Sequence, residues 1–232
     1  MGASARAEVF ARLYRSSGGA SAPEIDRERE SLGSAPRPAA PAVDTTFLRN
    51  VLQNHGTAAC APDRSAAVRE VGTYLYENLR SQRLVAGHDP RLAAMPWRDA
   101  GVLPRFGALE PGEEQVALSW ARLGIAEMGA VVTFTGRANP SADNLLPEHH
   151  IVIVDTGDLV ADAEEAWLRI GQFMAAEGRP RGINFIAGPS STADIEGRLV
   201  YGAHGPRCWH VILIGEGSTE ALERARAAIG AN

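Results

Sequence analysis

The chain has 232 residues, of which 45% are hydrophobic and 22% charged, with a formal net charge of −5. This composition is typical of a globular protein with a substantial buried core, and the negative charge argues against nucleic acid as a main partner, because nucleic-acid binding requires clustered Lys and Arg. No segment approaches the ~20 apolar residues of a membrane span, and the N-terminus lacks the apolar core of a signal peptide, so we expect a cytoplasmic protein without membrane insertion.

The N-terminal region predicts one short helix followed by an arm. Residues 6–14 place four large apolar side chains on one helical face. Residues 16–44 are rich in Gly, Ser, Ala and Pro and contain too few large apolar residues to build a core. We therefore expect residues 1–44 to form a helix and an arm, and residues 45–232 to form the compact domain.

Strand and helix patterns alternate through the compact domain. Helices are predicted to start at Asp44, Asp63, Asp162 and Ser218, all of which are residue types that cap helix N-termini. Strands are predicted at residues 57–60, 84–86, 116–118, 130–135, 151–154, 183–187 and 209–214. Prolines interrupt every pattern between residues 88 and 114. The alternation predicts an α/β domain with a mainly parallel sheet.

The richest candidate site follows the predicted strand 183–187 and reads Gly188-Pro189-Ser190-Ser191-Thr192-Ala193-Asp194-Ile195-Glu196. Ligands of open α/β sheets bind beyond the carboxyl ends of strands, and Gly188 permits a close backbone approach or a positive φ. We expect this segment to open a helix, so that three hydroxyls and the free first-turn N–H groups favour a small anion. The alternative is plain capping of that helix by Ser191 and Asp194; spacing alone does not separate the two interpretations.

Two further residues are candidates for chemistry. Glu127 is flanked by small apolar residues, so it could be half-buried and act as a base or nucleophile; the alternative is an exposed turn residue. His204 and Gly205 fall in a Gly-rich turn that could present the imidazole to a ligand, although a lone His there is more often a surface residue.

The two cysteines, Cys60 and Cys208, are too few for a disulfide framework, an iron–sulfur cluster or a cysteine-based zinc site. No zinc-binding motif and no dinucleotide-binding glycine fingerprint is present. We therefore expect no metal and no cofactor on this chain, and any redox metal it works with must lie on another chain.

Residues 115–215 resemble the LUD domain, a family of the lactate-utilisation protein C type. The resemblance rests on the Gly188–Glu196 segment, on Leu199–Leu213 after it, and on two upstream motifs, Ile125-Ala126-Glu127-Met128-Gly129 and Asn144-Leu145-Leu146-Pro147-Glu148-His149-His150-Ile151-Val152-Ile153-Val154. It implies a fold like the NagB/RpiA/CoA-transferase group, a Rossmann-like three-layer α/β domain.

The resemblance also implies a function. The chain would be an accessory, non-redox partner of iron–sulfur subunits that oxidise L-lactate to pyruvate. The alternative is an independent enzyme or binder, isomerase-like or transferase-like, that acts on a small phosphorylated or CoA-linked anion. By analogy with the fold group, Glu127 is the catalytic candidate. We expect it to meet Ser190–Thr192 and His204 in one cleft at the carboxyl edge of the sheet.

Overall fold

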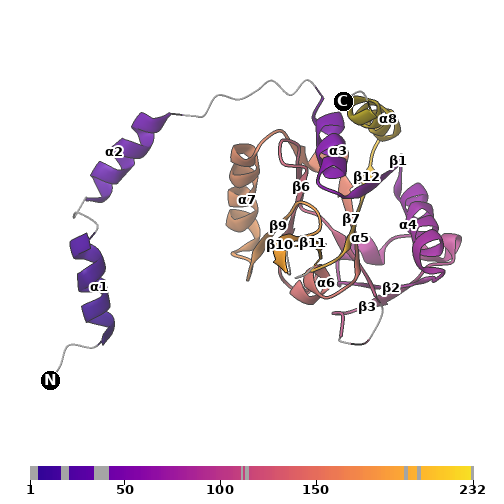
Figure 1. The fold of residues 1–232 in the computed structure, drawn as a ribbon, viewed down its shortest axis with the longest axis horizontal. Helices are drawn as coiled ribbons and strands as arrows, with labels where there is room; N and C mark the ends of the chain where they lie inside the picture. Colours follow the sequence, from indigo (N-terminus) through magenta and orange to yellow (C-terminus); the bar gives the residue numbers. More distant parts are fainter. Residues whose placement is uncertain are drawn as a thin grey trace. The chain divides into compact units, whose positions relative to one another are not determined.

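The computed structural model describes residues 5–16, 21–33, 42–110, 112, 115–195, 198–202 and 205–230, and the chain divides into two compact units, Met1–Ala39 and Ala40–Asn232. The first unit contains helices α1 (Ala5–Ser16) and α2 (Ala22–Leu32), and neither helix buries a residue (Figure 1). Helix α2 lies in the segment expected to be an arm. Pro23 in its first turn and the bond from the Ser21 N–H to Glu24 Oε2 (2.7 Å) explain why a helix starts there.

The centre of the second unit is a six-stranded sheet in which every strand pair is parallel. Its spatial order is β1 (Thr57–Ala61), β12 (Cys208–Ile214), β7 (His149–Asp155), β4 (Val116–Trp120), β2 (Arg83–Ala86) and β3 (Leu103–Phe106). All seven predicted strands are strands in the structure, at these or nearby bounds. Five belong to this sheet, whereas residues 130–135 and 183–187 belong to a second sheet. The expected α/β fold with a mainly parallel sheet is confirmed.

Helices cover both faces of this sheet (Figure 1). Helix α4 (Arg64–Leu79), α5 (Pro90–Ala93) and the 3-10 turn η1 (Trp97–Ala100) pack on one face, and α3 (Val43–Gln53) and α8 (Ser218–Gly230) pack on the other. Successive residues of β7 alternate between these layers: Ile151 and Ile153 join the α4 core, while Val152 and Val154 join the α3–α8 core.

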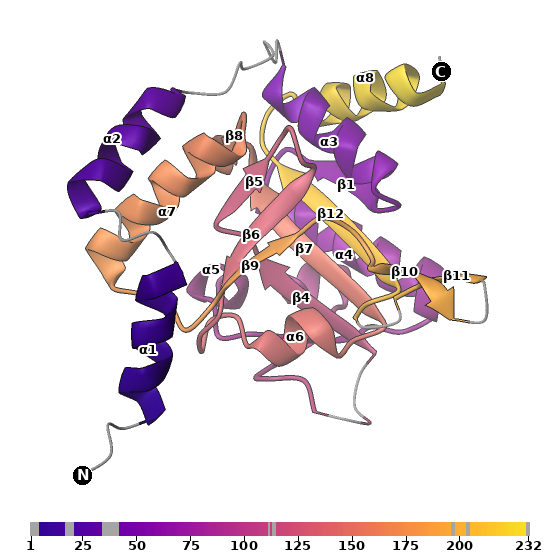
Figure 2. The same ribbon diagram turned by 60° about the vertical axis from the view of Figure 1, so that its left-hand side comes forward.

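A second sheet of four strands lies against the main one, with helix α7 (Ala163–Glu177) on its outer side (Figure 2). Its order is β8 (Leu159–Val160), β5 (Leu123–Ile125), β6 (Ala130–Phe134) and β9 (Ile183–Ile186). The expectation that residues 183–187 form a strand of the parallel sheet is therefore wrong. Strand β9 pairs antiparallel with β6 at the edge of the second sheet, and its residues are only half-buried.

The segment after β9 also differs from expectation, because no helix begins at Ser190–Thr192. Residues Ser191–Ile195 form strand β10, which pairs antiparallel with β11 (Arg198–Tyr201). The remaining short elements are α6 (Ser141–Leu145) and the 3-10 turn η2 (Thr156–Asp158). Among the residues that the structure describes, no helix combines the length and apolar character required to cross a bilayer.

Candidate functional site

Glu127 lies in the turn between β5 and β6 and is exposed rather than half-buried. Its Oε1 accepts a hydrogen bond of 2.7 Å from the backbone N–H of Ala163, and Ala163 is the first residue of α7. This bond satisfies one of the free N–H groups at the start of that helix, and the carboxylate also complements the helix dipole. The geometry therefore gives Glu127 a capping contact, and its assignment as a catalytic residue stays a prediction.

Gly188 has both properties expected of it. Its φ is +106°, and a Cβ at this position would lie 2.2 Å from the backbone oxygen of Asn54 in helix α3's C-cap. Pro189 is half-buried and Ser190 is exposed, and the Ser190 carbonyl accepts the N–H of Gly202 at 2.7 Å to close the β10–β11 hairpin. The turn therefore positions a hairpin rather than a helix N-terminus, and the helix-dipole argument for an anion here does not hold.

The Glu127 turn and the Gly188 turn do come together, but not at the expected edge. Asn54 donates through Nδ2 to the Met128 carbonyl at 2.8 Å and also meets Gly188, so both turns pack on the end of α3. Helix α3 leads within three residues into the first residue of β1, Thr57. This end is the amino edge of the parallel sheet, whereas ligands of such sheets bind at the carboxyl edge.

The rest of the predicted anion site is only partly visible. Ser191, Thr192 and Asp194 lie in β10, where the structure describes the backbone but not the side chains. His204 lies outside the described residues. Gly205 is half-buried, and a Cβ added there would have no described residue within 4 Å. A shared anion site built from these residues stays a prediction.

The carboxyl edge of the main sheet has a topological switch point between β2 and β4. From β2 the chain continues outward to β3, whereas from β4 it continues in the opposite direction to β7 and then β12. Loops that leave neighbouring strands in opposite directions leave a crevice, which is the usual ligand site of open α/β sheets.

A cavity of about 230 Å³ occupies this position. We call it the switch-point cleft. It is lined by the segments after β2, β4, β6 and α7, namely by Asp89, Arg91, Trp120, Arg122, Phe134, Thr135, Gly136, Arg137, Ala138, Asn139, Glu177, Gly178, Arg179 and Pro180. A wider cavity of about 700 Å³ shares Thr135, Gly136 and Arg137 with it and adds Arg181.

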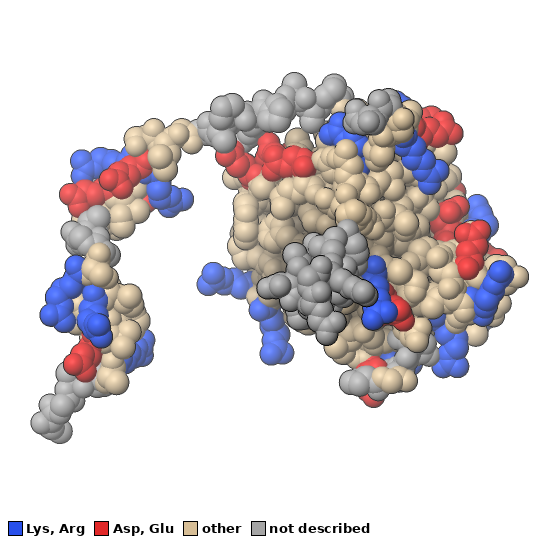
Figure 3. All heavy atoms as spheres, in the orientation of Figure 1, with Lys and Arg blue, Asp and Glu red and all other residues tan. Residues whose placement is uncertain are grey.

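The cleft is rich in guanidinium groups; the sequence contains arginine but no lysine. Arg91 forms a bidentate pair with Asp89, at 2.7 Å and 3.1 Å, and Arg122 pairs with Glu177. Figure 3 shows basic side chains projecting near the carboxyl-terminal end of α7. The residues that follow this helix include Arg179 and Arg181. Because guanidinium forks match carboxylate and phosphate oxygens, this edge is suited to an anionic ligand.

A chain of buried hydrogen bonds links the main sheet to the second sheet. His150 Nε2 lies 2.9 Å from Ser119 Oγ, which donates to Asn144 Oδ1 at 3.3 Å, and Asn144 Nδ2 donates to Thr133 Oγ1 at 3.3 Å. Burial lowers the pKa of His150 to about 4, so this imidazole is neutral at pH 7. These hydrogen bonds connect β7 and β4 to strand β6 of the second sheet. Residues 135–139, which line the cleft, follow directly after β6.

Both cysteine thiols have raised pKa values, whereas a cysteine that binds a metal does so as the thiolate. Burial raises the pKa of Cys60 to about 12 and also raises the pKa of Cys208.

Since the thiolate is the reactive form, we expect iodoacetamide at pH 8 to alkylate Cys60 about a thousandfold more slowly in the native protein than in urea. Mass spectrometry of a time course measures this rate, with Cys208→Ser isolating Cys60; equal rates in the two states would contradict the burial argument.

Comparison with known proteins identifies the family. The LUD domain model matches residues 113–214. "Lactate utilization protein C" of Shouchella clausii is 40% identical over 100 residues, which cover 42% of this chain and 43% of that protein. "Lactate utilization protein C" of Bacillus subtilis is 31% identical over 183 residues, which cover 68% of this chain and 75% of that protein.

A solved structure agrees on the fold. The DUF162 family protein from Deinococcus radiodurans superposes with a TM-score of 0.52 at 18% identity, covering 77% of this chain and all of that one. At this identity the likeness speaks for the architecture, whereas the B. subtilis match extends through most of both sequences. The chain belongs to the LUD domain family.

Proposed function

We propose that this protein serves lactate utilisation in the cytoplasm, as a subunit without its own redox centre that works beside iron–sulfur subunits. The observation that carries the proposal is the 31% identity to the B. subtilis lactate utilization protein C across three quarters of that protein's length. The Shouchella clausii relative carries the same name, although the match spans less than half of its length.

The chemistry of lactate oxidation supports the accessory role. Converting L-lactate to pyruvate removes two electrons and two protons, and the electrons must pass to an acceptor. An iron–sulfur cluster needs four ligands, usually thiolates, but this chain has two cysteines, and both have raised thiol pKa values. We therefore place the electron-accepting clusters on partner chains, while this subunit contributes binding or assembly.

Deletion of the gene in the native host tests the proposal. We expect the deletion strain to lose growth on L-lactate as sole carbon source, to grow normally on pyruvate, and to recover on L-lactate when the full chain is restored. The pyruvate culture is the control, because pyruvate lies after the proposed step.

Normal growth of the deletion strain on L-lactate would contradict the proposal. It would favour the alternative of an independent enzyme or binder of a small phosphorylated or CoA-linked anion. Purification of the tagged chain from the native host adds a second measurement: we expect iron to accompany the chain only in fractions that contain further, cysteine-rich subunits.

A further inference from the structure

We propose that the switch-point cleft is an oxyanion site that prefers a dianionic phosphate group to a monocarboxylate such as lactate or pyruvate. The inference does not depend on the role in lactate utilisation, because it rests on the donors, charges and position of the cleft.

Two residues of the cleft wall each carry a buried N–H donor that has no partner among the described residues. Trp120 is 2% exposed and Asn139 is 6% exposed, and both are among the residues that form the cavity wall. Within the described part of the chain, neither Trp120 Nε1 nor Asn139 Nδ2 has a hydrogen-bond acceptor. Native proteins pair nearly all buried donors, so two unpaired donors beside one cavity indicate a ligand that brings acceptor oxygens.

The charge of the cleft sets the class of that ligand. Arg91 and Arg122 are neutralised by their pairs with Asp89 and Glu177. Arg137 and Arg179 are exposed, and no ion pair engages either of them among the described residues. Two uncompensated guanidinium groups match the two charges that a phosphate group carries above its second pKa, whereas lactate and pyruvate each carry one.

The backbone fixes the wall that presents these groups. A Cβ on Gly87, just after β2, would lie 2.1 Å from the Ala138 carbonyl oxygen, so the 136–139 loop packs directly on the strand end. The His88 N–H also donates to the Arg137 carbonyl at 3.1 Å. The 136–139 loop therefore holds Arg137 and Asn139 next to the end of β2, and β4 holds the Trp120 indole on the other side of the switch point. This arrangement exists before a ligand binds.

The indole N–H resonances of the full chain provide a direct test. The protein has four tryptophans, and the peak that disappears in Trp120→Phe assigns Trp120. In a ¹H–¹⁵N titration with inorganic phosphate at constant ionic strength, we expect a saturable shift of this peak. A parallel titration with pyruvate should give a dissociation constant about tenfold weaker, the ratio expected for the loss of one charge-assisted hydrogen bond.

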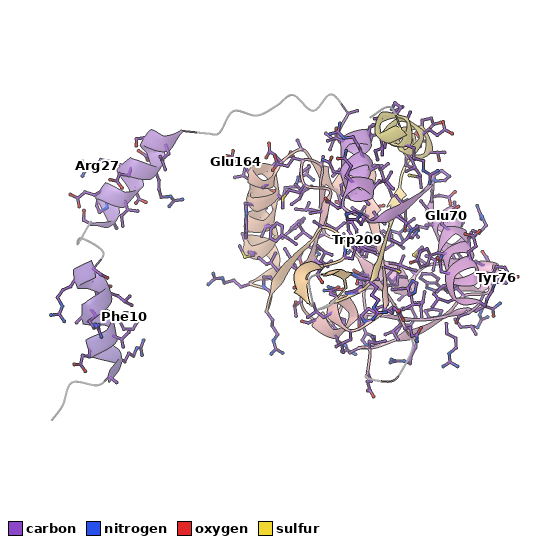
Figure 4. All side chains as sticks on the ribbon, in the orientation of Figure 1. Phe10, Arg27, Glu70, Tyr76, Glu164 and Trp209 are labelled. Atoms are coloured by element: carbon purple, nitrogen blue, oxygen red, sulfur yellow. The ribbon has the colours of Figure 1, made fainter. Side chains whose placement is uncertain are left out.

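Matched variants separate a site from general charge. Arg137→Ala with Arg179→Ala should weaken phosphate binding at least about tenfold, because it removes both uncompensated cations. Arg98→Ala, an exposed arginine of η1, should leave it unchanged. Trp120→Phe should weaken binding measured by calorimetry, whereas Trp209→Phe should not. Trp209 also has an Nε1–H with no acceptor among the described residues, but it lies in the α3–α8 core (Figure 4).

Three results would overturn the proposal. The first is a phosphate titration that leaves the Trp120 peak unmoved or shifts it without saturation. The second is equal phosphate affinity in the wild type and in the double arginine variant. The third is pyruvate binding at least as tightly as phosphate, which would assign the cleft to a monocarboxylate. None of these depends on growth on lactate, so this proposal and the proposed function can fail separately.

Discussion

Gly188→Ala is expected to lower the free energy of unfolding by about 4 kcal/mol, the range of severe single substitutions. Two causes add. The φ of +106° is a conformation that costs a non-glycine residue about 1–3 kcal/mol. The new Cβ would also lie 2.2 Å from the Asn54 backbone oxygen, so either helix α3 or the turn must shift. For a chain of this size, the loss corresponds to a melting temperature lower by about 10 °C.

Thermal and urea denaturation followed by circular dichroism measure this effect. Gly205→Ala is the matched control, because no described residue lies within 4 Å of a Cβ there and its φ is not in the left-handed region. We expect the control to change the unfolding free energy by less than about 1 kcal/mol. Equal effects of the two substitutions would show that the contact between the Gly188 turn and α3 contributes little to stability.

Asp143→Asn is expected to stabilise the protein at pH 7 by about 2–3 kcal/mol. Asp143 is fully buried in α6; its Oδ1 accepts the Leu109 N–H at 2.8 Å, and its Oδ2 has no partner among the described residues. Burial raises its pKa from 3.8 to about 6, against the opposing effects of the Leu109 bond and Arg105. At pH 7 the native state therefore holds an unfavourable buried charge, which Asn removes while keeping the acceptor for Leu109.

The raised pKa of Asp143 also predicts how the free energy of unfolding changes with pH. Between pH 4 and pH 6 the native state binds the Asp143 proton more tightly than the unfolded state does, so this residue makes wild-type stability increase as the pH falls through 6. In Asp143→Asn this increment should be absent. Urea denaturation at several pH values measures it, with the exposed Asp99→Asn as control. An Asn variant that is no more stable than the wild type at pH 7 would contradict the assignment.

The main sheet was predictable because its strands carry strong local signals. The continuous apolar run Ile151–Val154 and the caps at Asp63 and Asp162 are sufficient to identify β7, α4 and α7; both Asp side chains accept a first-turn N–H in the structure. The second sheet was not predictable in this way. Strands β5 and β8 have only three and two residues, which is too short for a periodic pattern, and β9 resembles a buried parallel strand in composition.

The hairpin after Gly188 shows two local signals in competition. Ser191 and Asp194 fit a helix-capping pattern, and this pattern led to the incorrect helix. However, Thr192 and Ile195 before Glu196-Gly197, and Val200 and Tyr201 after it, are β-branched or aromatic residues around a short glycine-containing turn sequence. Cross-strand pairing of Thr192 with Val200 is what the structure shows.

The switch-point cleft was missed for a different reason. Its arginines come from four segments, after β2, β4, β6 and α7, and only the strand order brings them together. Arg91, Arg122 and Arg137 each follow a predicted strand within a few residues, which is the one local signal of this edge that the sequence contains. Arg179 carries no such signal, because it follows helix α7 and reaches this edge only through the packing of the second sheet.

The pairing of β1 with β12 has a consequence for how the chain is made. Thr57 is in register with His210, so the first strand of the sheet has no neighbour until the last one leaves the ribosome. At about 5–20 residues per second, synthesis of the intervening segment takes on the order of 10–30 s. During that time β1 lacks its strand partner, and the apolar face of α3 lacks α8. The nascent chain therefore has a long interval in which aggregation competes with folding, as expected for a topology dominated by distant contacts.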